Sequence, residues 1–229
     1  MKIGGLQKVS LIDYPGKISA VIFTQGCNFR CPYCHNPELV DPERYQECLP
    51  EDEIFSYLEK RRGKLQAVAI TGGEPTVQSD IVSFAQRVKA MGYLIKLDTN
   101  GSQPEVLKEL LGHKLLDYIA MDIKGPIGKY AVIIRAPIKG ETIRQGIEII
   151  KASGINCEFR TTIVRSQLEE ADILAISALI KNAPFYVLQH YAPTKPLDEK
   201  FLREVSFSNE ELNAVRVKVG KKIARVVIR

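Results

Sequence analysis

Short runs of apolar and β-branched residues recur along the chain and predict the strands of a sheet. The runs are nearly continuous rather than alternating, as expected for parallel strands that are covered on both faces. The six clearest runs are Ser19–Gln25, Gln66–Thr71, Tyr93–Asp98, Asp117–Asp122, Asn156–Val164 and Phe185–Gln189. A shorter run at Ala224–Ile228 predicts a last strand.

Between these runs the apolar residues change to helical spacing. In Ser79–Met91 they fall on one face, with Ser79 as the predicted N-cap and Gly92 as the residue that ends the helix. Glu141–Ser153 repeats this pattern and is followed by Gly154. Further helices are predicted at Glu51–Lys60, Glu105–Leu111, Leu168–Lys181 and Asn209–Val219.

Strands that alternate with helices predict βα units and a parallel sheet with right-handed crossovers. Six such units fit in 229 residues, whereas a closed barrel of eight units usually needs about 250 residues. The predicted fold is therefore α/β, a partial (β/α)6 barrel of the TIM type in a single domain over residues 1–229. A flat doubly wound sheet is the alternative that this pattern leaves open. Residues 125–140 are predicted to form a loop near the barrel mouth.

The composition is that of an ordinary soluble protein, with 45% hydrophobic and 26% charged residues. No apolar run approaches the ~20 residues of a membrane-spanning helix, and the first residues lack the apolar stretch of a secretory signal. We therefore expect a cytoplasmic location and no membrane partner. The net charge is +5, but the basic residues are spread along the chain, so no nucleic-acid partner is expected.

The cysteines indicate metal chemistry rather than disulfide bonds. The chain has five, an odd number, and three of them lie between Cys27 and Cys34. A disulfide framework normally uses an even set spread over a small secreted chain. Cys48 and Cys157 stand alone and are predicted to be small apolar residues.

The clustered cysteines form a CxxxCxxC array directly after the first predicted strand: Cys27, Cys31 and Cys34. Three thiolates from one loop can each ligate one iron of an iron–sulfur cluster. Without a fourth ligand nearby, one iron keeps an open position, which is what a catalytic metal centre needs. The alternative is a zinc site with His35 or Cys48 as the fourth ligand, although zinc sites more often show paired CxxC units.

This array, with the aromatic Tyr33 before its last cysteine, resembles the signature of the radical S-adenosylmethionine (radical SAM) superfamily. The segment Thr71-Gly72-Gly73-Glu74-Pro75 follows the second predicted strand and resembles the GGE element of that family. Glycines let the backbone approach a ligand closely, and Glu74 offers a carboxylate to an ammonium group.

Three further segments resemble the activating enzymes of glycyl-radical proteins: Cys34-His35-Asn36-Pro37-Glu38, Asp98-Thr99-Asn100-Gly101 and Met121-Asp122-Ile123-Lys124. The segment Ser10–Gly16 strengthens this resemblance, which covers essentially the whole chain. It is greatest to the activating proteins of anaerobic ribonucleoside-triphosphate reductase, which are similar in length to pyruvate formate-lyase activating enzyme.

The resemblance implies a radical SAM type of barrel and a reaction. Cys27, Cys31 and Cys34 would ligate a [4Fe–4S] cluster, and Tyr33 would lie against the adenine of S-adenosylmethionine. An electron from a flavodoxin- or ferredoxin-like donor would lead to cleavage of S-adenosylmethionine into methionine and a 5′-deoxyadenosyl radical. That radical would remove a hydrogen atom from a glycine of a large partner enzyme.

The resemblance also implies which residues hold S-adenosylmethionine. Gly72, Gly73 and Glu74 would bind its methionine moiety, and Lys124 would bind its carboxylate. Asp98 and Asp122 would make polar contacts to the cofactor or to a nearby cation. Arg160 and Thr162 are additional candidates for such contacts. An ungapped alignment does not put His190 firmly at the position of the cofactor-contacting histidine of the formate-lyase activators, so a structural role and a ligand contact both stay open for it.

Each of these motifs lies at the carboxyl end of a predicted strand, where parallel α/β folds build their sites. Two other classes of function stay open. One is a radical enzyme acting on a small molecule such as a modified-purine precursor. The other is a non-enzymatic iron–sulfur or zinc protein, which would give no reason for Gly72-Gly73-Glu74.

Replacing Cys31 with alanine is expected to abolish iron–sulfur cluster assembly, because a ligand is lost, whereas Cys48→Ala should leave the cluster intact. Iron and sulfide content after anaerobic reconstitution measures both. Loss of the cluster in the Cys48 variant would contradict the ligand assignment.

Overall fold

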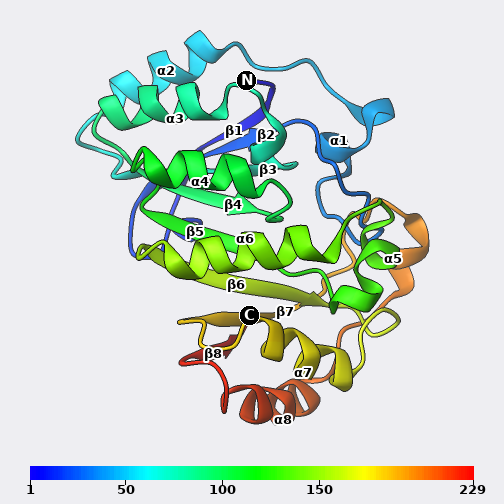
Figure 1. Ribbon diagram of the computed structural model, residues 1–229. Coiled ribbons are helices and arrows are strands. Elements are labelled where there is room, and N and C mark those ends of the chain that lie inside the picture. The colour runs from blue at the N-terminus through cyan, green and yellow to red at the C-terminus, as the bar shows by residue number, and fades with distance from the viewer.

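A single eight-stranded sheet forms the centre of the molecule in the computed structural model, which describes residues 1–229 (Figure 1). Its strands follow one another in chain order: β1 (Ile3–Ser10), β2 (Ser19–Thr24), β3 (Ala67–Gly72), β4 (Leu94–Thr99), β5 (Tyr118–Asp122), β6 (Asn156–Ile163), β7 (Tyr186–His190) and β8 (Val226–Ile228). The strand β1 pairs antiparallel with β2, and all the other pairs are parallel. The six predicted parallel strands and the last strand are thereby confirmed.

The helices connect these strands: α1 (Pro37–Val40), α2 (Glu51–Lys60), α3 (Ile81–Ala90), α4 (Pro104–Gly112), α5 (Tyr130–Ile134), α6 (Gly140–Ala152), α7 (Glu170–Leu179) and α8 (Asn209–Val219). In Figure 1, α3, α4 and α6 lie side by side over one face of the sheet. Right-handed crossovers between successive neighbouring strands place the helices on that common face. This arrangement is the partial barrel, since a doubly wound sheet would carry helices on both faces.

The structure departs from the predicted elements in several places. The N-cap of α3 is Asp80 rather than the predicted Ser79, and no side chain caps this end of the helix. The short helix α1 was not predicted. The strand β1 was not predicted, because its sequence, Ile3-Gly4-Gly5-Leu6, contains no continuous apolar run. Residues 125–140 are not simply a loop as predicted, because they contain the short helix α5, whose Tyr130 and Ile134 are buried. Local sequence gave no sign of α5, which is too short to show a clear helical period.

The two faces of the sheet differ in polarity. Ile95 and Leu97 of β4 are fully buried in the main hydrophobic core. The alternate residues of the same strand, Lys96 and Asp98, form an ion pair and lie on the opposite face, because successive side chains of a strand point to opposite sides. The concave inside of the partial barrel is therefore lined by charged groups.

Small side chains and two tyrosines pack together at the far end of the barrel. Tyr14, on the β1–β2 connection, packs against Tyr118 with 5.9 Å between ring centroids. Ala67 and Ala120 complete this small buried cluster. Since Tyr118 begins β5, the cluster lies at the amino ends of the parallel strands, and the opposite end is left for the site.

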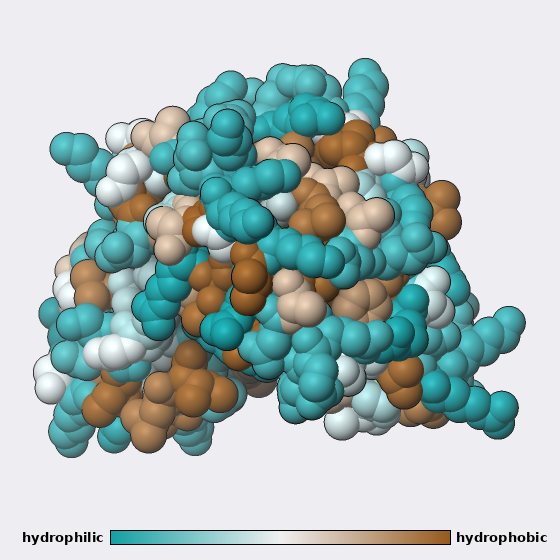
Figure 2. Space-filling view, turned by 90° about the horizontal axis from the view of Figure 1, so that it is seen from below, coloured by the Kyte–Doolittle hydropathy of each residue, from teal (hydrophilic) through white to brown (hydrophobic).

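No helix in the structure has the length and apolar character required to cross a bilayer. The face shown in Figure 2 is largely hydrophilic, with apolar side chains gathered in small separate groups.

Helix α6 approaches the end of β4 closely, and a glycine makes this possible. A Cβ at Gly146 would lie 2.5 Å from the carbonyl oxygen of Gly101, whereas a Cβ at Gly112 of α4 would meet nothing within 4 Å. Gly146→Ala should therefore lower the free energy of unfolding by about 1–3 kcal/mol through overpacking. The control Gly112→Ala should be neutral or stabilising by up to about 1 kcal/mol. Equal effects in denaturant titrations would contradict this packing argument.

Candidate active site

A cavity of about 450 Å³ opens at the carboxyl ends of the parallel strands. This volume is in the usual range for small-molecule sites. Every predicted site residue lines it: Cys27, Cys31, Tyr33, Cys34, Gly72, Gly73, Glu74, Asp98, Asp122, Lys124, Arg160 and Thr162. His190, whose role the sequence left open, lines it too. The fold thus brings together residues from strands β2 to β7 that are far apart in the sequence.

The cysteine loop, residues 27–34, is held from three directions. The backbone N–H of Arg30 donates to the carbonyl oxygen of Ile134 in α5 at 2.8 Å, and Asp198 N–H donates to Pro32 at 2.9 Å. The amide of Asn28 donates to Ser102 Oγ at 2.8 Å. These contacts explain what residues 125–140 do in the fold, since α5 supports the loop that carries the cysteines.

The glycines of the GGE element allow two backbone segments to touch. A Cβ at Gly73 would lie 2.1 Å from the carbonyl oxygen of Gly26, just before the cysteine loop. The N–H of Glu74 donates to that same oxygen at 2.8 Å, and Gly73 N–H donates to Thr24 at 2.8 Å. Only glycine fits here, so the close approach that the sequence assigned to a ligand is first an approach between β3 and the segment after β2.

The Glu74 carboxylate is 1% exposed and joins the ends of β3 and β4. It accepts hydrogen bonds from Thr76 N–H at 3.0 Å, Thr99 Oγ1 at 2.7 Å and Asn100 N–H at 2.6 Å, and from the Thr76 hydroxyl. Burial raises the pKa of Glu74, and these hydrogen bonds partly oppose the rise. The carboxylate is therefore a structural link, and contact with a ligand ammonium stays a prediction.

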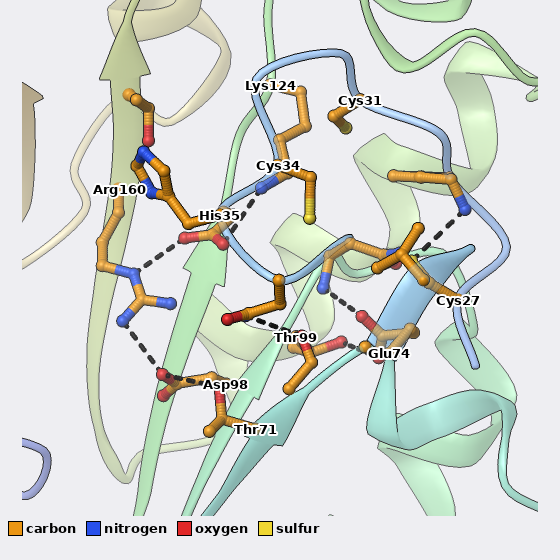
Figure 3. A pocket seen from close by; sticks show the side chains of 18 of the residues that line it. Cys27, Cys31, Cys34, His35, Thr71, Glu74, Asp98, Thr99, Lys124 and Arg160 are labelled. Atoms are coloured by element: carbon orange, nitrogen blue, oxygen red, sulfur yellow. Dashed lines mark hydrogen bonds and ion pairs between the residues drawn. The ribbon is translucent and has the colours of Figure 1, made fainter. Parts of the chain in front are cut away.

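A chain of ion pairs crosses the inner face of β4, β5 and β6 (Figure 3). Arg160 donates from Nε to Asp122 at 2.8 Å and from Nη1 to Asp98 at 3.1 Å. The other oxygen of Asp122 accepts from Lys124 at 3.1 Å, and Lys96 pairs with Asp98. Burial by itself would raise the pKa of Asp122, but Arg160 and Lys124 outweigh it and hold that pKa well below its usual range.

The radical SAM superfamily model matches residues 21–175 of this chain. The match spans the cysteine array, the GGE element and strands β2 to β6. This chain belongs to the radical SAM superfamily.

Relatives of this radical SAM protein include named enzymes. It is 36% identical over 99% of its length, and 95% of the other chain, to a Methanocaldococcus jannaschii protein called "Putative glycyl-radical enzyme activating enzyme". It is 30% identical over 54% of its length to the pyruvate formate-lyase-activating enzyme of Clostridium pasteurianum, covering 52% of that chain. It is 25% identical over 81% of its length to the 7-carboxy-7-deazaguanine synthase of Thermococcus kodakarensis, covering 78% of that chain.

The fold of this chain is similar to that of solved structures. SuiB of Streptococcus suis superposes with a TM-score of 0.68 over 91% of this chain, at 12% sequence identity. The radical SAM protein spans about half of SuiB, 48% of its length. At this identity the likeness shows the fold alone.

Membership of the superfamily implies a [4Fe–4S] cluster and S-adenosylmethionine, and the thiols present fit the cluster. All three line the same cavity, and Cys27 Sγ accepts a hydrogen bond from Phe29 N–H at 3.3 Å. Burial raises the pKa of Cys27 to about 12 and that of Cys31 to about 11. Because iron binds thiolates, its binding would release the protons that these buried thiols otherwise keep.

Of the two side chains named as a fourth zinc ligand, only His35 lines the cavity. His35 Nε2 donates to the carbonyl oxygen of Ala192 at 2.8 Å, and its ring stacks on Tyr191. Cys48 donates to Gln25 Oε1 at 3.4 Å and does not line the cavity. Both side chains are thus engaged with neighbouring groups of the protein.

Two aromatic residues of the cavity differ in how their polar atoms are used. The Tyr33 side chain is buried beside Tyr191, with 6.3 Å between ring centroids, and its hydroxyl has no hydrogen-bond partner. An unpaired buried hydroxyl in a cavity wall fits a polar ligand. His190 lines the cavity, but its Nε2 lies 3.0 Å from Asn209 Oδ1 at the start of α8, which is a structural contact.

Sequence reasoning left several lining residues without a role: Asp13, Asn36, Thr71, Thr99 and Asn100. All five belong to segments that the resemblance singled out. The signal was therefore present, but only the tertiary structure shows that these side chains face the cavity.

Glu74→Gln should lower the free energy of unfolding by about 1–3 kcal/mol, because an amide group would face N–H and hydroxyl donors in place of an accepting oxygen. The matched control is Glu59→Gln, whose side chain is 59% exposed and should change stability little. Denaturant unfolding of both cluster-free variants checks this, and an unchanged midpoint for Glu74→Gln would show that the link carries no stability.

Proposed function

We propose that this radical SAM protein is an activating enzyme that generates a glycyl radical on a partner enzyme. The proposal is carried by one observation: three cysteine thiols, the GGE element and a charged inner wall meet in one cavity. The extent of the likeness to the Methanocaldococcus jannaschii protein, 99% of this chain, supports the same activity.

In this proposal Cys27, Cys31 and Cys34 hold the [4Fe–4S] cluster in the reducing cytoplasm. When bound, the cluster supplies the single electron with which S-adenosylmethionine is cleaved. Lys124 holds the methionyl carboxylate, and the buried Tyr33 side chain offers its ring and its unpaired hydroxyl to the adenosyl part. The walls formed by the ends of the strands shield the reacting groups from water.

The partner that we propose is anaerobic ribonucleoside-triphosphate reductase, and the proposed electron donor is a flavodoxin- or ferredoxin-like protein. Support comes from the segments His35-Asn36-Pro37, Asp98–Gly101 and Met121–Lys124, which resemble the activating enzymes of glycyl-radical proteins. The resemblance over the whole chain is greatest to the activating proteins of that reductase.

A second candidate is a radical SAM enzyme that acts on a small molecule. The observation in its favour is the likeness to the 7-carboxy-7-deazaguanine synthase of Thermococcus kodakarensis, which extends over 81% of this chain. The lower identity, 25% against 36%, places this candidate second.

The test is anaerobic reconstitution with iron and sulfide, followed by dithionite and S-adenosylmethionine. We expect 5′-deoxyadenosine from the wild type and none from the Cys31→Ala variant. Addition of anaerobic ribonucleoside-triphosphate reductase should give the electron paramagnetic resonance signal of a glycyl radical, in an amount that depends on S-adenosylmethionine.

The outcomes separate the candidates. A loaded cluster with no 5′-deoxyadenosine, with or without the reductase, would contradict radical SAM activity. Product without any glycyl signal would contradict this choice of partner, and other glycyl-radical enzymes and purine precursors would be tried next.

A further inference from the structure

Arg160 connects three carboxylates on three adjacent strands. Its guanidinium donates to Asp122 of β5 at 2.8 Å and to Asp98 of β4 at 3.1 Å, and Nη1 lies 3.9 Å from Glu158 of its own strand β6. The side chain is 13% exposed, so these groups replace most of the water around the charge. A planar guanidinium suits this task because its donors have fixed directions.

The two oxygens of Asp122 serve different cations. Oδ1 accepts from Arg160, and Oδ2 accepts from Lys124 at 3.1 Å. By holding Oδ1, Arg160 sets the direction of Oδ2 and thereby the place of the Lys124 ammonium group. Lys124 lines the same cavity as Cys27, Cys31 and Cys34, so its charge acts on the same space as the cysteine loop.

The charges of this group of ion pairs do not balance. Four cations, Lys96, Lys124, Arg160 and Arg229, face three carboxylates, Asp98, Asp122 and Glu158, which leaves one positive charge in surplus. Lys96 pairs with Asp98 and Arg229 with Glu158 at 3.3 Å. Arg160 and Lys124 share the single charge of Asp122, one through each oxygen, and Arg160 also shares Asp98 with Lys96. The Lys124 ammonium group is therefore only partly neutralised.

We infer that Arg160 is a positioning residue that leaves the Lys124 ammonium group free to bind a ligand carboxylate. The inference rests on the proposed function and identifies that group as the methionyl carboxylate of S-adenosylmethionine. Without Arg160 the surplus disappears, and Asp122 neutralises Lys124 within the protein. Arg160 thus acts through Asp122 and Lys124 rather than by touching the ligand.

The test compares two ligands that differ in the carboxylate alone: S-adenosylmethionine and decarboxylated S-adenosylmethionine. Equilibrium dialysis is performed on cluster-loaded protein without reductant, so that no cleavage occurs. The wild type should prefer S-adenosylmethionine by about tenfold or more, the size expected for a hydrogen-bonded charge. Arg160→Gln should lose most of this preference while its affinity for the decarboxylated ligand changes little.

Two further variants separate positioning from a general loss of charge. Arg165→Gln removes an exposed arginine that pairs with Glu211, and it should keep the full preference. Arg160→Lys keeps the charge but can hold fewer carboxylates, so it should keep part of the preference. If Arg160→Gln does not load its cluster, the Arg160→Lys variant is used for the test instead. An undiminished preference of Arg160→Lys for S-adenosylmethionine would then contradict the inference.

A double-mutant cycle tests the route through Asp122. In an Asp122→Asn background the surplus positive charge no longer depends on Arg160, so adding Arg160→Gln should cost little further preference. Simple addition of the two effects, or a full preference in Arg160→Gln alone, would overturn the inference. A wild type that cleaves S-adenosylmethionine without preferring it would also overturn it, whereas one that binds neither ligand would contradict the proposed function instead.

Discussion

The site depends on the contact between the backbone at Gly73 and the backbone at Gly26. The end of β3 is bonded there to the segment that leads from β2 into the cysteine loop, at a distance that admits no side chain. The element expected to bind the methionine moiety is therefore held directly against the loop expected to bind iron, so neither can move without the other. Glu74 extends that link to the end of β4 through Thr99 and Asn100.

The inner wall of the partial barrel carries charged side chains, and these are stabilised by pairing with one another. Isolated charges at such positions would be costly, and here each carboxylate accepts from at least one cation. The outer face of the same strands carries the apolar residues that pack under the helices. Because side chains alternate along a strand, one short segment such as Leu94–Thr99 can supply both the core and the site.

Support for the cysteine loop comes from parts of the chain that are distant in sequence. The carbonyl oxygen of Ile134 in α5 accepts a hydrogen bond from the Arg30 N–H, and the Asp198 N–H donates to the carbonyl oxygen of Pro32. Arg135, at the end of α5, pairs with Asp198 at 2.8 Å. The loop is thus enclosed by two segments that also contact each other, which restricts the positions its cysteines can take before any iron is bound.

The sequence by itself determined the order of strands and helices, because apolar runs and helical spacing are local properties that survive in one dimension. It also determined the cysteine array and the GGE element, whose residue types are dictated by chemistry. Only the tertiary structure decided that Gly73 meets Gly26, that α5 lies under the cysteine loop and that Arg160 lies between Asp98 and Asp122. These contacts join residues far apart in the chain. The approach of Gly73 to Gly26 and that of Arg160 to Asp122 follow from the register of neighbouring strands, which no local pattern encodes.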